Sequence, residues 1–252
     1  MENTLKRRLE RNEAAIGTWI SSGSPTMVDL LRKLPFDWFV LDAEHSAISI
    51  ETVAHMIQVL NGSTATPLVR VGQIDQALFK IVLDAGAHGL VVPLVNSAEE
   101  AERAVRFSKY PPAGVRGVAG AKASDYGLSL GSYIRTANAE TMVIAQIETP
   151  QAVANIEAIV GVEGVDVAFV GPSDLTMTMG LLDDRSNPKV TEAMVRVVKA
   201  CDEAGKAAGV MASTLDEARL AMERGFKFIS LATDLRHATM GARSFLEAVG
   251  RK

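Results

Sequence analysis

The chain has 252 residues, of which 48% are hydrophobic and 22% charged, values typical of a soluble globular protein with a sizeable core. Its 26 basic and 30 acidic side chains give a formal net charge of −4, which argues against nucleic acid or an anionic membrane as an electrostatic partner. A single cysteine, Cys201, excludes an internal disulfide framework and favours a reducing compartment. Because the sequence has neither an apolar signal-peptide core nor a membrane-length apolar run, we expect a cytoplasmic protein.

Short apolar runs alternate with longer helical patterns along the chain, as in repeated βα units around a parallel sheet. After an amphipathic helix in residues 1–15, we expect strands near Ile16–Ser21, Trp38–Asp42, Pro67–Val71, Gly89–Leu94, Met142–Glu148, Val167–Gly171, Ala208–Ala212 and Phe228–Ala232. Several of them lack polar alternation, as expected of strands covered on both faces. We therefore predict one α/β domain over residues 1–252, a (β/α)₈ TIM barrel, with a doubly wound open sheet as the alternative.

The helices between these strands carry recognisable start and stop signals. Ser97 with Glu100, and Thr214 with Glu217, have the spacing of a capping box, and Thr149 precedes a proline. Helical stretches are followed by glycines that can adopt the left-handed conformation at a helix end: Gly86, Gly205 and Gly225. The longest irregular stretch, Tyr110–Ser132, predicts a functional loop or an interface.

Ionisable side chains gather at the carboxyl ends of four expected strands. In a (β/α)₈ barrel these ends form one rim, where the active site is built. The segments concerned are Asp42-Ala43-Glu44-His45, Arg70, Gln146-Ile147-Glu148 and Gly171-Pro172-Ser173-Asp174. One such residue would mean little, but the convergence of four strands favours a functional rim.

Glu148 and Asp174 are the paired carboxylates of this rim. Carboxylate, amide or carbonyl oxygens and water are the ligands of hard divalent ions such as Mg²⁺ or Mn²⁺. With open positions left on the ion, a bidentate 2-oxo acid could complete its coordination. Alternatively, the two residues are only favourable anions near helix N-termini.

Arg70, His45 and Asp84 are the further candidates for chemistry. The planar guanidinium of Arg70 can bind a carboxylate or a developing enolate oxygen, although a structural ion pair with Asp42 or Glu44 is also compatible with the sequence. His45 suits proton transfer near neutral pH, against the alternative of a solvated loop histidine. Asp84 lies at a helix C-terminus, where its charge opposes the helix dipole, unless it is simply a surface residue.

Motifs that the sequence lacks argue against further classes of enzyme. No lysine occupies an inward or terminal strand position, so a Schiff-base aldolase would lack its nucleophile; Lys122, in the long loop, is the lysine nearest to an exception. The loops after the seventh and eighth strands, Ser213-Thr214 and Thr233-Asp234, lack a glycine-rich phosphate cradle. No nucleotide-binding glycine motif occurs either.

An ordered set of motifs runs along the whole chain: Gly17-Thr18-Trp19, Asp37-Trp38, Asp42-Ala43-Glu44-His45, Arg70-Val71, Leu83-Asp84-Ala85-Gly86-Ala87, Tyr110-Pro111-Pro112, Gly114, Arg116-Gly117, Gln146-Ile147-Glu148-Thr149, Gly164-Val165-Asp166 and Gly171-Pro172-Ser173-Asp174-Leu175. In combination and spacing, this set resembles the HpcH/HpaI aldolase family. That family comprises metal-dependent (class II) pyruvate aldolases on a barrel of the phosphoenolpyruvate/pyruvate type.

The resemblance implies roles for individual residues. Glu148 and Asp174 would bind Mg²⁺, Mn²⁺ or Co²⁺, and Arg70 would hold the pyruvate unit and its enolate. His45, helped by Asp42 and Asp84, would move the proton through an ordered water. The residues implied to contact the oxo acid or wall its pocket are Gln146, Gly171, Pro172, Ser173 and Trp19.

The resemblance also implies a homohexamer in which the last helix packs on a neighbouring barrel. Lys122 lies in a loop near which family members carry an arginine, so the identity of the aldehyde stays open. The expected reaction is the reversible cleavage of a 4-hydroxy-2-oxo acid to pyruvate and an aldehyde through a metal-bound enolate, with small molecules as the partners.

Two further classes of function remain as alternatives. One is another lyase or a decarboxylase on the same barrel, including an acyl-CoA lyase, for which the sequence offers no obvious basic cluster to bind the nucleotide tail. The other is a non-catalytic protein that binds a 2-oxo acid. Such a protein could dispense with His45 and Asp84, so their presence favours an enzyme.

Overall fold

The eight strands close into a parallel barrel in the computed structural model, which describes residues 2–182 and 184–251. In chain order they are β1 (Ala15–Ile20), β2 (Trp38–Asp42), β3 (Thr66–Arg70), β4 (Gly89–Val92), β5 (Met142–Ile147), β6 (Val167–Val170), β7 (Ala207–Ala212) and β8 (Phe228–Thr233). Each strand pairs with its sequence neighbours, and β1 pairs with β8, with Ala15 opposite Phe228. The predicted (β/α)₈ barrel is confirmed, and the open-sheet alternative is wrong because the ring is closed.

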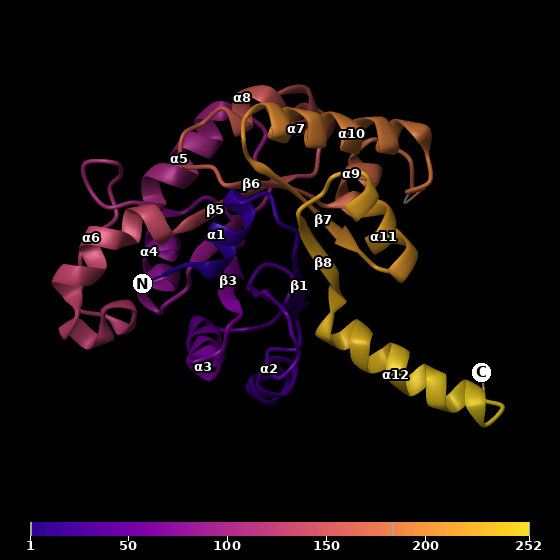
Figure 1. The fold of residues 1–252 in the computed structure, drawn as a ribbon, viewed down its shortest axis with the longest axis horizontal. Helices are drawn as coiled ribbons and strands as arrows, with labels where there is room; N and C mark the ends of the chain where they lie inside the picture. Colours follow the sequence, from indigo (N-terminus) through magenta and orange to yellow (C-terminus); the bar gives the residue numbers. More distant parts are fainter. Residues whose placement is uncertain (1, 183, 252) are drawn as a thin grey trace.

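The helices lie around the outside of the barrel, apart from α1 at its amino-terminal end and α12, which projects away from it (Figure 1). They are α1 (Thr4–Glu10), α2 (Pro25–Leu31), α3 (Ile50–Leu60), α4 (Gln76–Asp84), α5 (Ala98–Ser108), α6 (Leu130–Glu140), α7 (Pro150–Ala154), α8 (Ile156–Val160), α9 (Pro172–Thr178), α10 (Pro188–Glu203), α11 (Leu215–Glu223) and α12 (Asp234–Ala248), with a 3₁₀ segment η1 (Lys122–Gly127). The N-terminal helix is shorter than predicted, and α6 begins inside the stretch expected to be irregular. Within the described ranges, no helix has both the length and the apolar character needed to cross a membrane.

The predicted caps form hydrogen bonds. Ser97 Oγ accepts from the Glu100 backbone N–H at 3.3 Å, and Thr214 Oγ1 accepts from that of Glu217 at 3.1 Å. Thr149 Oγ1 begins α7 in the same way, accepting from Ala152 N at 3.0 Å. Gly86, Gly205 and Gly225 all have positive φ angles, of 107°, 65° and 95°. These local signals fix where each helix begins and ends, and therefore where each strand presents its carboxyl end.

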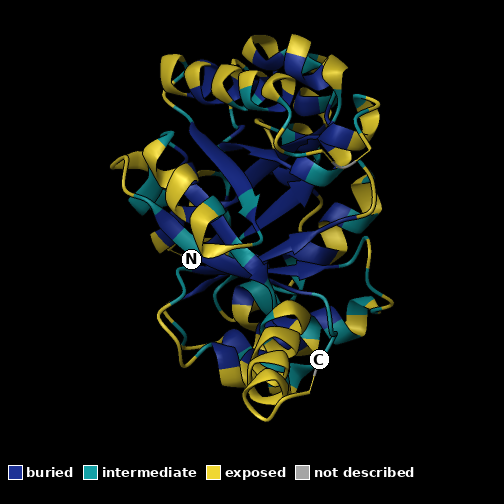
Figure 2. Ribbon diagram, turned by 90° about the vertical axis from the view of Figure 1, so that its right-hand side faces the viewer, coloured by how far each residue is buried: buried dark blue, intermediate teal, exposed yellow. Residues whose placement is uncertain are grey.

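Two apolar layers hold the barrel together. One lies between the strands and the outer helices, and the other fills the barrel interior, where Trp38 stacks on Phe228 with ring centroids 4.0 Å apart. A Cβ added to Gly17 would lie 2.0 Å from the Trp38 ring, so only glycine leaves room for that stack. Leu5 of α1 belongs to the interior cluster and closes the amino-terminal end of the barrel. Figure 2 shows the strands buried and the outer helical faces exposed, which is why the strands lack polar alternation.

His88 makes the stability of this fold sensitive to acid. Among the described residues its Nδ1 has no hydrogen-bond partner, and burial lowers the pKa of the imidazole from 6.5 to about 4. The imidazole of His88 binds a proton more tightly in the unfolded chain than in the folded protein. The stability that comes from keeping His88 neutral is therefore fully present above pH 6.5 and is lost as the pH falls towards 4.

We expect urea unfolding to show this loss, with a slope of up to about 1.4 kcal/mol per pH unit from this one group. His88→Gln, which cannot be protonated, should have a shallower decline in its free energy of unfolding between pH 6.5 and 4. Parallel declines in the wild type and the variant would contradict this prediction.

Candidate active site at the carboxyl ends of the strands

A cavity of about 130 Å³ opens at the carboxyl ends of the strands. Seven of the eight strands, β4 being the exception, contribute to its wall at or just beyond their ends. Most of the predicted site residues line it: Trp19, Asp42, Arg70, Gln146, Glu148, Gly171, Pro172, Ser173 and Asp174. Its wall also includes residues that sequence reasoning did not select, namely Ser21, Phe169, Met211 and Thr233.

Arg70 is held at the centre of an ion-pair cluster with two carboxylates. Its Nε and Nη2 donate to the two oxygens of Asp42 at 2.9 and 2.8 Å, and its Nη1 lies 3.1 Å from Glu44 Oε2. The guanidinium carbon lies 4.4 Å from the ring centroid of Trp19. The structural ion pair considered from the sequence is therefore present, and it orients the guanidinium, which also lines the cavity.

Asp42 and Glu44, the two carboxylates that contact Arg70, have pKa values shifted in opposite directions from their usual ranges. Burial would raise the pKa of Asp42, but the hydrogen bonds and charge of Arg70 outweigh it and hold the pKa below its usual range. For Glu44, burial outweighs the charge of Arg70 and raises the pKa. Asp42 is therefore the firmly ionised partner of Arg70, and its Oδ1 also accepts the backbone N–H groups of Glu44 and His45, each at 3.2 Å.

Glu148 is buried, with 4% of its surface exposed, and its carboxylate accepts hydrogen bonds from two neighbours. Gln146 Nε2 donates to its Oε1 at 2.7 Å, and the backbone N–H of Leu94 donates to Oε2 at 3.3 Å. Leu94 has a φ of 51°, a costly conformation for a residue with a side chain, and it directs that N–H towards the carboxylate. A Cβ at Gly171 would lie 2.7 Å from Glu148 Oε1, so the glycine leaves the space that this carboxylate occupies.

The arrangement of these groups fits a hard divalent cation. Burial, followed by the negative charge of Asp174, raises the pKa of Glu148 to about 7, and the charge of Arg70 offsets these two effects only in part. Gln146 Oε1 is buried and has no hydrogen-bond partner among the described residues. Two carboxylates and an amide oxygen are the donors that Mg²⁺ or Mn²⁺ prefers.

Among the described residues, no group of three or more His, Cys, Asp or Glu side chains is placed to hold a metal ion, so the protein donors available here are the two carboxylates and the Gln146 amide oxygen. Asp174 also lies in the first turn of α9, where a negative charge is favourable. Stabilising this helix N-terminus and binding a cation are compatible roles for the residue.

The sequence as a whole is similar to one known protein family. A model of the HpcH/HpaI aldolase/citrate lyase family matches residues 15–240. The chain belongs to this family. The resemblance seen in the sequence motifs is thereby confirmed.

Individual members of the HpcH/HpaI family match over nearly the whole chain. A hydroxypyruvate/pyruvate aldolase of Paraburkholderia phytofirmans is 39% identical over 98% of this chain and 97% of its own length. A 5-keto-4-deoxy-D-glucarate aldolase of Shigella boydii is 35% identical, covering 92% and 91%. The crystal structure of an HpcH/HpaI aldolase/citrate lyase family protein from Burkholderia cenocepacia superposes with a TM-score of 0.95, at 36% identity over 98% and 99%. The chain is therefore an enzyme of the lyase class.

Two residues predicted for the site of this HpcH/HpaI member lie outside the cavity wall. The imidazole of His45 is 66% exposed, and its Nε2 lies 3.7 Å from Glu44 Oε2. The carboxylate of Asp84, at the end of α4, accepts from Arg116 Nη2 at 2.7 Å. Lys122 also lies away from the cavity, with its Nζ 3.5 Å from Asn61 Oδ1. The structure thus does not bring the side chains of His45 and Asp84 into the cavity wall with the other candidates, although the His45 backbone N–H donates to Asp42.

Two arginines in loops were not selected by sequence reasoning as site residues. Arg116 is fully buried, and its guanidinium packs over the rings of Tyr110 and Tyr133, 4.6 and 5.7 Å from their centroids. Arg185, in the segment between α9 and α10, donates to the hydroxyl of Ser173 on the cavity wall. Neither lies at a strand end, so the strand-end rule that found the other residues gives no signal for them.

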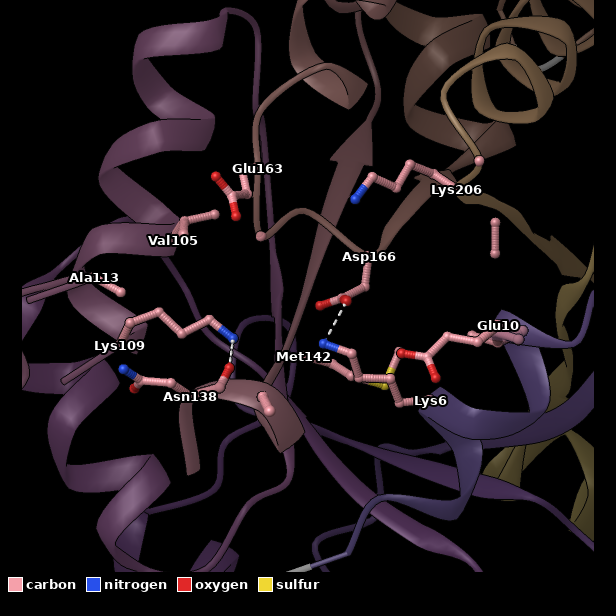
Figure 3. Close-up of a pocket in the computed structure, with 15 residues that line it drawn as sticks. Lys6, Glu10, Val105, Lys109, Ala113, Asn138, Met142, Glu163, Asp166 and Lys206 are labelled. Carbon is pink, nitrogen blue, oxygen red and sulfur yellow. Dashed lines mark hydrogen bonds and ion pairs between the residues drawn. The ribbon is translucent and has the colours of Figure 1, made fainter. Parts of the chain in front are cut away.

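A larger cavity, of about 610 Å³, lies at the opposite end of the barrel and is shown in Figure 3. Two of its lysines are engaged in structural contacts: Lys6 pairs with Asp166 at 2.9 Å, and Lys109 Nζ donates to the carbonyl of Asn138 at 2.7 Å. Burial lowers the pKa of Lys109 to about 8. Active sites of (β/α)₈ barrels lie at the carboxyl ends of the strands, so we assign the chemistry to the smaller cavity.

Proposed function

We propose that this lyase is a metal-dependent aldolase that reversibly cleaves a 4-hydroxy-2-oxo acid to pyruvate and an aldehyde. The proposal rests on one observation. The carboxylates of Glu148 and Asp174 line the same cavity as the oriented guanidinium of Arg70. A 2-oxo acid presents a carboxylate and a ketone that match these two features. The relatives named as hydroxypyruvate/pyruvate and 5-keto-4-deoxy-D-glucarate aldolases support the same reaction type.

The cation, Mg²⁺, Mn²⁺ or Co²⁺, would be bound by Glu148 and Asp174. When bound, it supplies Lewis-acid polarisation of the 2-oxo group. The protein contributes the orientation of these ligands: Gln146 and the Leu94 N–H fix Glu148, and the absence of a side chain at Gly171 leaves room for its carboxylate. Substrate contacts would come from Gln146, from the backbone at Gly171, Pro172 and Ser173, and from Trp19 in the cavity wall.

Arg70 would stabilise the charge that develops on the 2-oxo oxygen as the C3–C4 bond breaks. Its two hydrogen bonds to Asp42 and its contact with Glu44 use at most three of the five N–H donors of a guanidinium, so donors remain for the enolate oxygen of pyruvate. Fixed donors of this kind act where charge appears in the transition state, and they need no reorganisation at that moment.

His45 is our candidate for the group that accepts the 4-hydroxyl proton, with Asp42 and Asp84 assisting it. The aldehyde forms as this proton leaves and the C3–C4 bond breaks, and C3 of the enolate is then protonated to give pyruvate. Because His45 is exposed and lies outside the cavity wall, the proton would pass through water. The hydrogen bond from the His45 backbone N–H to Asp42 supports this role by tying its loop to the rim.

The test is pyruvate release from a panel of 4-hydroxy-2-oxo acids, with and without a chelator. We expect cleavage of at least one acid, loss of activity in excess chelator, and recovery on adding Mg²⁺, Mn²⁺ or Co²⁺, because the carboxylates cannot polarise a ketone alone. Full activity in chelator, or a substrate adduct on a lysine trapped by borohydride, would overturn the proposal.

A homohexamer in a cytoplasmic location completes the proposal. The last helix, α12, projects from the barrel in Figure 1, and Asp234 is its one buried residue. Its exposed apolar side chains supply a surface for packing on a neighbouring barrel: Leu235, Met240, Phe245 and Leu246, followed by Val249. Cys201 is a free, buried thiol, which suits a reducing compartment.

A further inference from the structure

Leu94, two residues after the end of β4, has a strained backbone conformation beside the proposed cation site. Its φ of 51° lies in the left-handed region that residues with a side chain rarely adopt. The side chain is 52% exposed, so burial of an apolar group does not account for this conformation. No described residue of β4 lines the active-site cavity. The segment after this strand contributes a backbone group instead: the Leu94 N–H, which donates to Glu148 Oε2 at 3.3 Å.

Asn96 fixes the same residue through its carbonyl group. The side-chain Nδ2 of Asn96 donates to the Leu94 carbonyl oxygen at 2.8 Å. With Glu148 on the N–H and Asn96 on the carbonyl, both polar backbone groups of Leu94 have a partner. A residue in a sparsely populated conformation persists only where its surroundings determine that conformation, and these two hydrogen bonds do so here.

Asn96 is itself anchored to the segment that follows β5. Its Oδ1 accepts from the hydroxyl of Thr149, and its backbone carbonyl accepts from Asn155 Nδ2 at 2.7 Å. Thr149 directly follows Glu148 in the chain and begins α7. Asn96 therefore links the turn that presents the Leu94 N–H to the segment that carries the carboxylate receiving it.

The orientation of Glu148 decides whether its carboxylate can bind a cation together with Asp174. Gln146 donates to one carboxylate oxygen at 2.7 Å, and Leu94 donates to the other. If Leu94 relaxed to a negative φ, its N–H would change direction and leave Oε2 without this donor. Residues that orient the ligands of a metal ion typically account for about 10–100-fold in its affinity.

We infer that Asn96 is a positioning residue, which holds Leu94 in its left-handed conformation and thereby orients the Glu148 carboxylate for cation binding. This inference rests on the proposed function, because it concerns the cation of the same site. Asn96 acts through the backbone of Leu94 and contacts neither the cation nor the substrate.

The test is Asn96→Asp, which removes the two side-chain N–H donors but keeps an oxygen that can accept from Thr149. We expect Mn²⁺, titrated into the cation-free protein, to bind about tenfold to hundredfold more weakly than to the wild type. An added negative charge would by itself attract the cation, so a weaker affinity reports the lost donors. Hydrogen exchange in the segment that contains Leu94 should become faster, while β4 and β5 stay protected.

A second substitution distinguishes control of the Leu94 conformation from a general effect on stability. Glycine adopts positive φ angles without the cost that a side chain imposes. The double variant Leu94→Gly with Asn96→Asp should therefore bind Mn²⁺ more tightly than Asn96→Asp alone. A purely structural role of Asn96 would give no such rescue.

The matched control is Asn61→Asp, the same substitution at an exposed residue after α3, which should leave the Mn²⁺ affinity at the wild-type value. Wild-type affinity in Asn96→Asp, or a double variant that binds no more tightly than Asn96→Asp, overturns the inference alone. A wild type that binds no Mn²⁺ and cleaves none of the 4-hydroxy-2-oxo acids overturns the proposed function and the inference with it.

Discussion

Replacing Glu148 by Gln should lower pyruvate-forming activity by at least about a thousandfold, since Lewis-acid stabilisation by a bound cation is worth several kcal/mol. The amide keeps the shape of the side chain but loses the negative charge that would bind the cation. It also relieves the repulsion between Glu148 and Asp174 in a buried setting. We therefore expect loss of function without loss of fold.

Thermal unfolding with and without Mn²⁺ distinguishes a loss of cation binding from a loss of the fold. The wild type should gain stability as Mn²⁺ is added, since a ligand of the folded state raises the unfolding temperature. Glu148→Gln should show no such gain, and without cations it should unfold at the same temperature as the wild type or higher. The control is Glu203→Gln on α10, a carboxylate that is 64% exposed and should leave both responses unchanged. An active Glu148→Gln variant with a normal Mn²⁺ response would show that the ligand assignment is wrong.

The barrel could be predicted because each of its local signals is strong. The strands are buried on both faces and appear as short apolar runs, and caps such as Ser97 and Thr149 mark where the following helices begin. Strand bounds agree with the prediction to within a residue or two at each end. The long segment before α6 was less predictable. Its η1 contains positive φ values at Asp125 and Tyr126, which neither composition nor periodicity indicates.

The cavity residues were predictable for a geometric reason. Parallel strands of a closed barrel bring their carboxyl ends to one rim, so Asp42, Arg70, Glu148 and Asp174 converge although they are far apart in the sequence. Loop residues do not follow this rule. Asp42 accepts two backbone N–H groups of the loop after β2, and in that conformation the His45 imidazole is mostly exposed. The position of Arg185 likewise depends on a loop conformation, which no periodic pattern encodes.

Arg70→Lys should reduce both aldol cleavage and oxaloacetate decarboxylation by about tenfold to hundredfold, because lysine keeps the charge but loses the planar fork. Both reactions form pyruvate enolate, and Arg70 is proposed to stabilise that oxygen in each. Lysine also cannot reproduce the paired Nε and Nη2 hydrogen bonds to Asp42. Removing the charge altogether with Arg70→Met would leave Asp42, which is 3% exposed, without its partner and should cost about 3–5 kcal/mol of unfolding free energy.

His45→Ala provides the contrast that distinguishes charge stabilisation from proton transfer. A general base typically contributes about 10²–10⁴-fold, so aldol cleavage should fall by that factor. Decarboxylation of oxaloacetate breaks a bond to carbon dioxide and needs no hydroxyl deprotonated, so it should fall much less. The ratio of the two activities is the measurement: it should shift strongly in His45→Ala and hardly at all in Arg70→Lys. If His45→Ala depressed both reactions equally while a folded Arg70→Lys stayed fully active, the two roles would have to be exchanged.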